Sequence, residues 1–303
     1  MEPTAETWLT RHAVAVKDWG WKRILRALFR IKARHLHVET GIVYGRANGQ
    51  ELTLDLAMPR EGGPFPALVT IPGGGWEWIA QPDSMNILAE MLAEHGFVAA
   101  ELTYRLAPRD KYPAQIEDCK AAVRWLRANA AKYRIDPERI GALGFSSGAQ
   151  LACLLGLTKP ADGLEGETNH ADASSRVDAV VSFFGPTDFT LRSWLERYEK
   201  RLMLSVLGAP FAEHPELYQR ASPVHYVRPE APPHLFFHGT EDTIVSIEHS
   251  RLLAAKLQAV GASARLVEVP GQNHGAWPRR VFNPCLEQAI GFLQEKLTKP
   301  VAK

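Results

Sequence analysis

The segment Gly144-Phe145-Ser146-Ser147-Gly148 has the residue types and the spacing for nucleophilic chemistry. A serine hydroxyl attacks a carbonyl carbon when a neighbouring base removes its proton. The glycines on both sides allow a strand to turn sharply into a helix, because a Cβ at either position would collide across the turn. The turn places the Ser146 hydroxyl near a helix N-terminus, where N–H groups favour negative charge. We therefore expect Ser146 to be a nucleophile.

A nucleophilic serine of this kind needs a histidine that follows it in the chain. The sequence contains 11 histidines, so the residue type alone discriminates little. His238 closes a predicted strand and His249 lies within a predicted helix, which counts against both. His274 lies in a glycine-rich loop directly after the predicted strand Ala264–Glu268. This position brings His274 to the same sheet edge as Ser146, and we expect it to be the base.

The carboxylate that orients the histidine is expected in the loop His238-Gly239-Thr240-Glu241-Asp242. Asp242 is the first candidate, and its neighbour Glu241 is the rival. The loop leaves the preceding strand at the same edge of the sheet. Ligands of open parallel sheets bind at these carboxyl ends of strands. The serine, the histidine and the acid are thus predicted to converge from three separate strands.

The stretch Ile71-Pro72-Gly73-Gly74-Gly75-Trp76 follows another predicted strand, Ala67–Ile71. Consecutive glycines leave backbone N–H groups bare, and together with the N–H of Ser147 they can surround an oxyanion. A phosphate cradle is the competing interpretation. It fails because neither G-x-x-x-x-G-K-[ST] nor G-x-G-x-x-G follows.

Short apolar strands alternate with amphipathic helices along most of the chain, which predicts an α/β fold with a mostly parallel sheet and helices on both faces. The first two strands read as a hairpin joined at Arg46-Ala47-Asn48-Gly49. The strands are expected at Val38–Val43, Leu52–Ala57, Ala67–Ile71, Val98–Tyr104, Ile140–Phe145, Val177–Phe184, Leu235–His238 and Ala264–Glu268. The helices are expected at Ser84–His95, Pro113–Tyr133, Ser147–Leu157, Ser246–Val260 and Asn283–Leu297.

The alternation is interrupted in two places and preceded by a basic segment. Lys159–Ser175 is a polar loop, and Phe189–Arg220 reads as one or two inserted helices of the kind that form lids. Asp18–Arg34 reads as a basic amphipathic helix. This helix either packs on the main domain or over the site, or it attaches to an anionic membrane surface.

Composition limits the classes of function. Lys and Arg number 35 against 34 Asp and Glu, and a net charge of +1 disfavours a general nucleic-acid binder. The sequence has no apolar stretch of about 18 residues that could span a bilayer. Cys119, Cys153 and Cys285 are widely spaced, which fits a reduced compartment and suggests neither disulfides nor a thiolate metal site. The N-terminal residues lack a signal-peptide pattern, so a cytoplasmic location is expected.

Taken together, these motifs resemble the α/β-hydrolases of the hormone-sensitive-lipase-like esterase group, especially bacterial carboxylesterases of the acetyl- or feruloyl-esterase-like branch. The resemblance extends from about Val43 to the last predicted helix. The matching stretches are Gly73–Trp76, Tyr104–Pro108, Ile135–Ile140, Gly144–Gly148, Gly185–Asp188, Ala221–Val224, His238–Asp242 and His274–Gly275.

The resemblance implies an eight-stranded α/β-hydrolase domain over residues 37–303, a cap-like insertion near 186–225 and an N-terminal extension over 1–36. It implies no metal and no organic cofactor. It assigns Ser146 as nucleophile, His274 as general base and acid, Asp242 as the orienting carboxylate, and the N–H groups of Gly74, Gly75 and Ser147 as the oxyanion hole.

The chain departs from the family pattern at two positions. Pro72 stands where the family usually has a histidine that is thought to brace the glycine loop, and proline braces only by fixing its own φ. Ser147 stands where the family usually has alanine, and it keeps the backbone N–H.

These observations predict a serine carboxylesterase that hydrolyses small to medium acyl esters through an acyl-enzyme. An amidase or formamidase would use the same residues. An inactive hydrolase fold acting as a binding protein, and a membrane-surface lipase, are alternatives of other classes. The expected partner is a small ester, with a homodimer as a further expectation. Aromatic residues near the loops could line an acyl or aryl pocket, or simply pack there: Trp76, Trp78, Phe145, Phe189 and Trp277.

Overall fold

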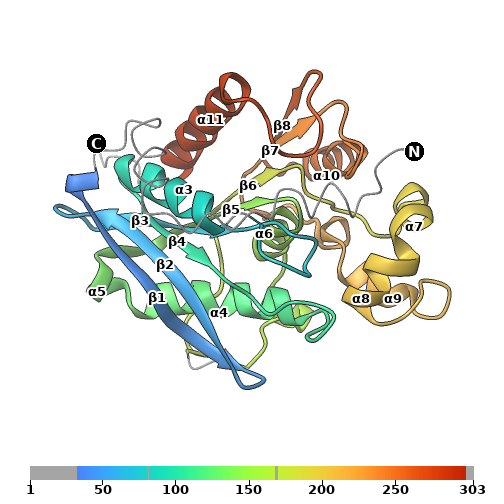
Figure 1. Ribbon diagram of the computed structural model, residues 1–303, viewed down its shortest axis with the longest axis horizontal. Helices are drawn as coiled ribbons and strands as arrows, with labels where there is room; N and C mark the ends of the chain where they lie inside the picture. Colours follow the sequence, from blue (N-terminus) through green and yellow to red (C-terminus); the bar gives the residue numbers. More distant parts are fainter. Residues whose placement is uncertain (1–32, 81, 168–169, 298–303) are drawn as a thin grey trace.

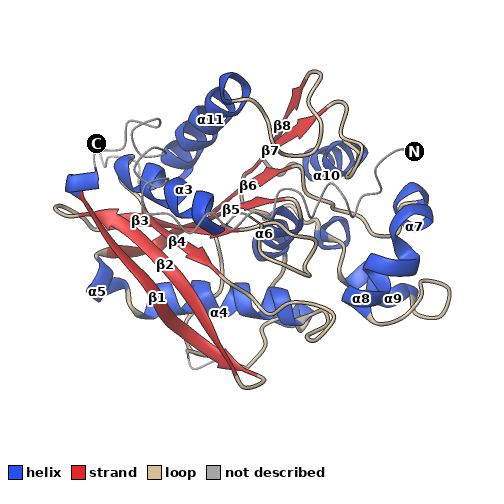
Figure 2. Cartoon of the chain, in the orientation of Figure 1, coloured by secondary structure: helices blue, strands red, loops and turns tan. Residues whose placement is uncertain are grey.

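The computed structural model describes residues 33–297 except 81 and 168–169. Within these residues, eight strands form one sheet in the order β1-β2-β4-β3-β5-β6-β7-β8 (Figure 2). The predicted mostly parallel sheet is confirmed, since β1 and β2 are antiparallel, β2 is antiparallel to β4, and the remaining neighbours run parallel. The strands are β1 Leu36–Ala47, β2 Gln50–Pro59, β3 Phe65–Ile71, β4 Val98–Leu102, β5 Ile135–Phe145, β6 Ala179–Phe183, β7 His234–Gly239 and β8 Ala264–Val269.

The hairpin of β1 and β2 turns through Asn48 and Gly49, whose φ angles are 48° and 72°. Two residues with positive φ give the turn whose twist matches antiparallel strands, and the Asn-Gly pair is well suited to it. The predicted hairpin is therefore present, and each of its strands is longer than the sequence pattern indicated.

Two apolar clusters, one on each face, hold the helices against the sheet (Figure 1). Alternate residues of β3 show the division, because Ala67 and Val69 join one cluster and Leu68 joins the other. The first face carries α4 Ala114–Ala128, α6 Ser147–Leu157 and α10 Glu248–Ala259, and the second carries α3 Pro82–Glu94 and α11 Arg279–Leu297.

The boundaries of some elements differ from the predicted ones. The single helix expected over Pro113–Tyr133 breaks at Asn129 into α4 and the short α5, Ala130–Tyr133. β5 begins at Ile135, which pairs with Phe65, so a proline-containing stretch joins the strand. The last helix begins at Arg279, four residues before the predicted start, and Pro284 lies inside it, where the missing backbone N–H removes one i→i−4 hydrogen bond.

Short helices fill the connection between β6 and β7, and we call residues 192–220 the cap segment. They are α7 Arg192–Tyr198, the π-helical turn η3 Glu199–Met203, α8 Leu204–Leu207 and α9 Pro215–Arg220, with the 3-10 turn η4 Pro223–Tyr226 after them. Further 3-10 turns are η1 Ala33–His35 and η2 Pro160–Asp162. The basic helix expected over Asp18–Arg34 lies outside the described residues apart from its end. In the part of the chain that the structure describes, every helix is too short or too polar to cross a bilayer.

Candidate active site

Ser146 stands at the turn between β5 and α6 with φ 52° and ψ −121°. A left-handed φ is costly for a residue with a side chain and is kept only where its surroundings enforce it. The close approach of Gly148 is part of that enforcement, because a Cβ there would lie 2.2 Å from the carbonyl oxygen of Ile71. The backbone N–H of Ser146 donates to the Phe183 carbonyl at 2.9 Å, which ties the turn to β6.

His274 joins Ser146 to Asp242 by two hydrogen bonds. Its Nε2 lies 2.9 Å from Ser146 Oγ, and its Nδ1 lies 2.7 Å from Asp242 Oδ2. The three residues come from the loops after β5, β7 and β8, which leave the sheet at the same edge (Figure 1). Because a carboxylate only accepts, Nδ1 carries the proton and Nε2 faces the hydroxyl as an acceptor. This arrangement lets Nε2 take the serine proton.

The carboxylate of Asp242 is buried and fully engaged. Burial acts to raise its pKa, but hydrogen bonds from His238 and His274, together with the backbone N–H of Val245, hold the pKa well below its usual range. Oδ1 accepts from the N–H groups of Ile244 and Val245 at 2.9 Å and 2.8 Å. The aspartate is therefore ionised beside the imidazole.

Glu241, the rival acid, lies elsewhere. Its side chain is exposed, and its backbone N–H donates to the Gln272 carbonyl at 3.0 Å. Of the two neighbouring acids, the structure thus brings Asp242 and not Glu241 to His274.

The glycine loop lies against the serine turn. A Cβ on Gly73 would come within 3.1 Å of the Ser146 Cβ, so the two backbones approach closely. Gly74 has φ 133°, and a Cβ on it would lie 1.9 Å from the Trp78 carbonyl oxygen, so only glycine fits. The loop folds back on itself through hydrogen bonds from the N–H of Ala80 to Gly73 O and from Trp78 to Gly74 O.

Tyr104 supplies a brace for the loop at the position of Pro72. Its hydroxyl is buried and donates to the Pro72 carbonyl at 3.0 Å. Burial raises the pKa of Tyr104, so the hydroxyl keeps its proton and remains a donor. Pro72 is therefore held by a hydrogen bond to its carbonyl, in addition to the fixed φ that its ring imposes.

The aromatic residues near the loops differ in exposure. Trp76, Phe189 and Trp277 are buried, Phe145 is partly buried, and Trp78 is 40% exposed. The Trp76 and Phe189 rings meet edge to face at 5.4 Å. The Trp277 indole donates to the Asn273 carbonyl at 2.7 Å. Packing beneath the loops accounts for the buried rings, and their contact with a substrate stays a prediction.

Two amides that the sequence patterns did not indicate connect these loops. Asn273 Oδ1 accepts from the backbone N–H groups of Thr243 and His274, at 3.0 Å and 2.7 Å, which joins the acid loop to the histidine loop. Gln150 on α6 accepts from the Trp76 indole at 3.0 Å and donates to the Ala221 carbonyl at 2.7 Å. In the sequence, only their positions could have indicated them: Gln150 lies four residues after the nucleophile, and Asn273 lies directly before the histidine.

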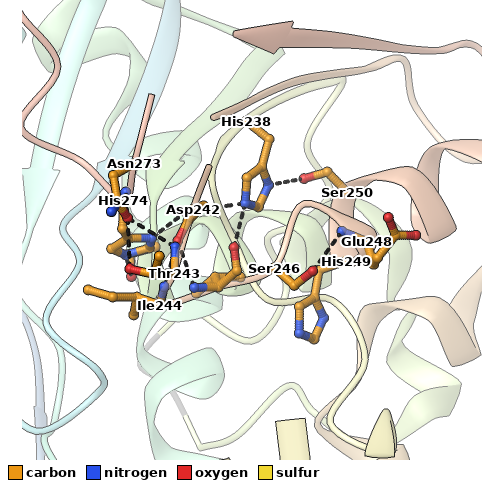
Figure 3. Close-up of polar contacts among 12 residues, drawn as sticks. His238, Asp242, Thr243, Ile244, Ser246, Glu248, His249, Ser250, Asn273 and His274 are labelled. Atoms are coloured by element: carbon orange, nitrogen blue, oxygen red, sulfur yellow. Dashed lines mark hydrogen bonds and ion pairs between the residues drawn. The ribbon is translucent and has the colours of Figure 1, made fainter. Parts of the chain in front are cut away.

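His238 also belongs to the site, although its position at the end of a strand counted against it. Its Nε2 lies 3.3 Å from Asp242 Oδ2, and its side chain is fully buried (Figure 3). Its place four residues before Asp242 is the signal that could have indicated it. Among the described residues, no group of three or more His, Cys, Asp or Glu side chains has an arrangement that could hold a metal ion.

The strand order, the serine turn and the placement of three polar loops at one sheet edge define an α/β-hydrolase. The expected fold class is confirmed by solved structures of esterases that share it. The chain belongs to the BD-FAE family, whose family model matches residues 54–257. This confirms the predicted resemblance to bacterial carboxylesterases.

Individual relatives agree with this placement. Esterase LipC of Mycobacterium tuberculosis is 33% identical over 245 residues, covering 80% of this chain and 60% of LipC. A truncated carbohydrate esterase from gut microbiota is similar in structure, with a TM-score of 0.77, 29% identity and coverage of 87% and 97% of the two chains. Thermogutta terrifontis esterase 2, solved as its sarin-phosphonylated form, has a TM-score of 0.73, 28% identity and coverage of 87% and 97%. The chain spans about three fifths of the length of the curated relatives it matches.

Proposed function

We propose that this protein is a serine carboxylesterase that hydrolyses small to medium acyl esters through an acyl-enzyme intermediate. The observation that carries the proposal is the continuous pair of hydrogen bonds from Ser146 through His274 to Asp242, at 2.9 Å and 2.7 Å. The serine attacks the ester carbonyl while His274 takes its proton, and Asp242 stabilises the imidazolium that forms. His274 then protonates the departing alcohol, and water repeats the sequence on the acyl-enzyme.

The N–H groups of Gly74, Gly75 and Ser147 form the oxyanion hole in this proposal. The glycine loop supports it, because its carbonyls turn back onto Trp78 and Ala80. Donors fixed before the reaction stabilise the developing negative charge without reorganising. The cap segment contacts the glycine loop, since Leu202 lies 3.7 Å from where a Cβ on Gly75 would be.

The relatives support an ester substrate and leave its identity open. LipC is named an esterase, the gut protein a carbohydrate esterase, and the Thermogutta protein an esterase that sarin phosphonylates. A phosphonate that bonds to a serine resembles the tetrahedral intermediate of ester hydrolysis. A reduced, cytoplasmic location and a homodimer remain predictions, the first supported by three buried free cysteines.

The proposal is tested with p-nitrophenyl esters of increasing acyl length and with a fluorophosphonate probe. We expect wild-type protein to hydrolyse the shorter esters and to gain one phosphonyl group by mass spectrometry. Ser146→Ala should lower kcat by about 10⁴-fold or more and gain none. Ser263→Ala is the matched control, because Ser263 lies at the opposite end of the sheet, just before β8. Undiminished turnover in Ser146→Ala would refute the proposal, and faster cleavage of matched anilides than esters would favour an amidase.

A further inference from the structure

His238 lies on the side of Asp242 away from His274 (Figure 3). It ends strand β7, its side chain is fully buried, and it touches neither Ser146 nor open solvent. Its Nε2 is 2.8 Å from the Val245 carbonyl oxygen and 3.3 Å from Asp242 Oδ2. Its Nδ1 is 2.7 Å from the Ser250 hydroxyl. The ring is thus held at both nitrogens.

These contacts assign the proton on the ring. A carbonyl oxygen and a carboxylate only accept, so Nε2 must carry a hydrogen that the two oxygens share. Nδ1 is then free to accept from Ser250, whose hydroxyl can donate to it. The Nε2–H of His238 therefore faces Asp242 as a donor.

His238 completes the set of donors around the Asp242 carboxylate. Oδ1 has two backbone donors, from Ile244 and Val245, and Oδ2 has His274 on one side. The second side of Oδ2 faces His238. A carboxylate with donors on both oxygens cannot rotate without losing hydrogen bonds, and each donor draws charge from the oxygen that it touches.

We propose that His238 is a positioning residue for ester hydrolysis, which fixes the Asp242 carboxylate toward His274 and limits how strongly that carboxylate attracts the His274 proton. The proposal rests on the function proposed above. The hydrogen bond from His238 also contributes to the lowered pKa of Asp242.

Removing the His238 N–H should shift the pH dependence of kcat/KM in a predictable direction. Without it, Oδ2 carries more negative charge and stabilises the His274 imidazolium more strongly, so base catalysis should begin at a higher pH. The acidic limb of the kcat/KM profile reports that pH. Other ionisable groups also act on His238 or Asp242, and none of them is changed in the variants below. They are Asp188, Tyr198, His249, Arg251 and Glu268, and Arg251 and Glu268 form an ion pair at 2.7 Å.

The test compares two amides at position 238. His238→Gln reaches the Nε2 position with an N–H, whereas His238→Asn is shorter and places its amide nearer Ser250. We expect Asn to lower kcat about tenfold with little change in KM, and to move the acidic limb up by about half a pH unit or more. Gln should restore both quantities to near wild type. His234→Gln is the control, because His234 is equally buried on the same strand and hydrogen-bonds Pro232 instead.

Each result decides the proposal. A wild-type kcat and limb in His238→Asn would overturn it, and so would an equal change in the Gln and Asn variants. If His238→Asn does not fold, Ser250→Ala replaces it, since losing the hydroxyl weakens the N–H donor and should move the limb up by less. An unmoved limb in Ser250→Ala would then overturn the proposal. Activity that survives Ser146→Ala would instead refute the proposed function itself.

Discussion

The Asp242 carboxylate sits at the centre of the polar network, with donors from His238, His274 and two backbone N–H groups. A buried carboxylate without such donors would take up a proton, because burial penalises the charge. Here the hydrogen bonds outweigh burial and keep the pKa of Asp242 low. The residue is therefore a permanent negative charge beside His274.

At the scale of single residues, Asp242→Asn should lower kcat strongly, whereas Glu241→Gln should leave it nearly unchanged. The asparagine amide can donate to His274 Nδ1 and so stabilise the wrong tautomer, which we expect to lower kcat by about 10³–10⁴-fold. Glu241 is exposed, and its replacement should change kcat by less than about twofold. Steady-state kinetics on a short p-nitrophenyl ester measures both. A larger loss in Glu241→Gln would mean that the acid is misassigned.

The sequence predicts Ser146 from the glycines that allow a sharp strand-to-helix turn, and it predicts His274 from its loop position directly after a strand at the same sheet edge. The sequence also favours Asp242 over Glu241, but it gives no geometric reason for this choice, because adjacent residues on a loop point in different directions only once the loop is folded. The position of His238 at a strand end misleads for a similar reason. The sequence alone does not show that the loop after a strand-end histidine turns back and brings a carboxylate four residues later against it.

At the scale of elements, the serine turn and the glycine loop fit together through backbone contacts. A Cβ on Gly148 would meet the carbonyl oxygens of Ile71 and Pro72 at 2.2 Å and 2.5 Å. Backbone atoms at the end of β3 cannot move aside without disturbing the sheet, so the start of α6 has little freedom. Close contact of these elements is what brings Ser146 next to the loop that is proposed to bind the oxyanion.

Two glycine-to-alanine variants should separate this contact from helix propensity. Gly148→Ala should destabilise the protein by about 3 kcal/mol or more, because the new methyl group overlaps with backbone atoms. Gly291→Ala, in an open position of α11, should stabilise it by about 0.5–1 kcal/mol. Urea unfolding measures both free energies. Equal stabilities of the two variants would contradict the fit described here.

The alternation of apolar strands and helices predicted each strand of the sheet, but not their order. β4 lies between β2 and β3, although β3 precedes it in the chain. Apolar patterning indicates that a strand is buried, but it does not determine which strands lie beside it in the sheet. Element ends were also missed where side-chain patterning is weak, as at the extension of β5 from Ile140 back to Ile135.

At the scale of the whole molecule, His234 and His249 are buried so deeply that the uncharged ring is favoured. Burial lowers the pKa of His234 to about 4 and that of His249 to about 3. His249 Nδ1 accepts from the backbone N–H groups of Thr187 and Asp188, which also requires the neutral ring. Both side chains take up protons near pH 6.5 when the chain unfolds.

Acid should therefore destabilise the fold. Because the unfolded chain binds more protons below pH 6.5, the free energy of unfolding falls as the pH drops from there toward 4 and 3. Each histidine should contribute a loss of about 2 kcal/mol between pH 7 and pH 5. His234→Gln should remove the contribution of His234 to this pH dependence, which is measured by urea unfolding at pH 7 and pH 5. An identical pH dependence in the variant and the wild type would mean that His234 is not the source.

The cap segment is fastened to the body on two sides. The Tyr112 N–H donates to the Val206 carbonyl at 2.9 Å, and the Tyr198 hydroxyl donates to the Ile244 carbonyl, in the acid loop, at 2.7 Å. Lifting the segment off the body would break both hydrogen bonds, and one of them ends on the loop that carries Asp242. Movement of the segment is therefore coupled to the loop that holds the acid beside His274.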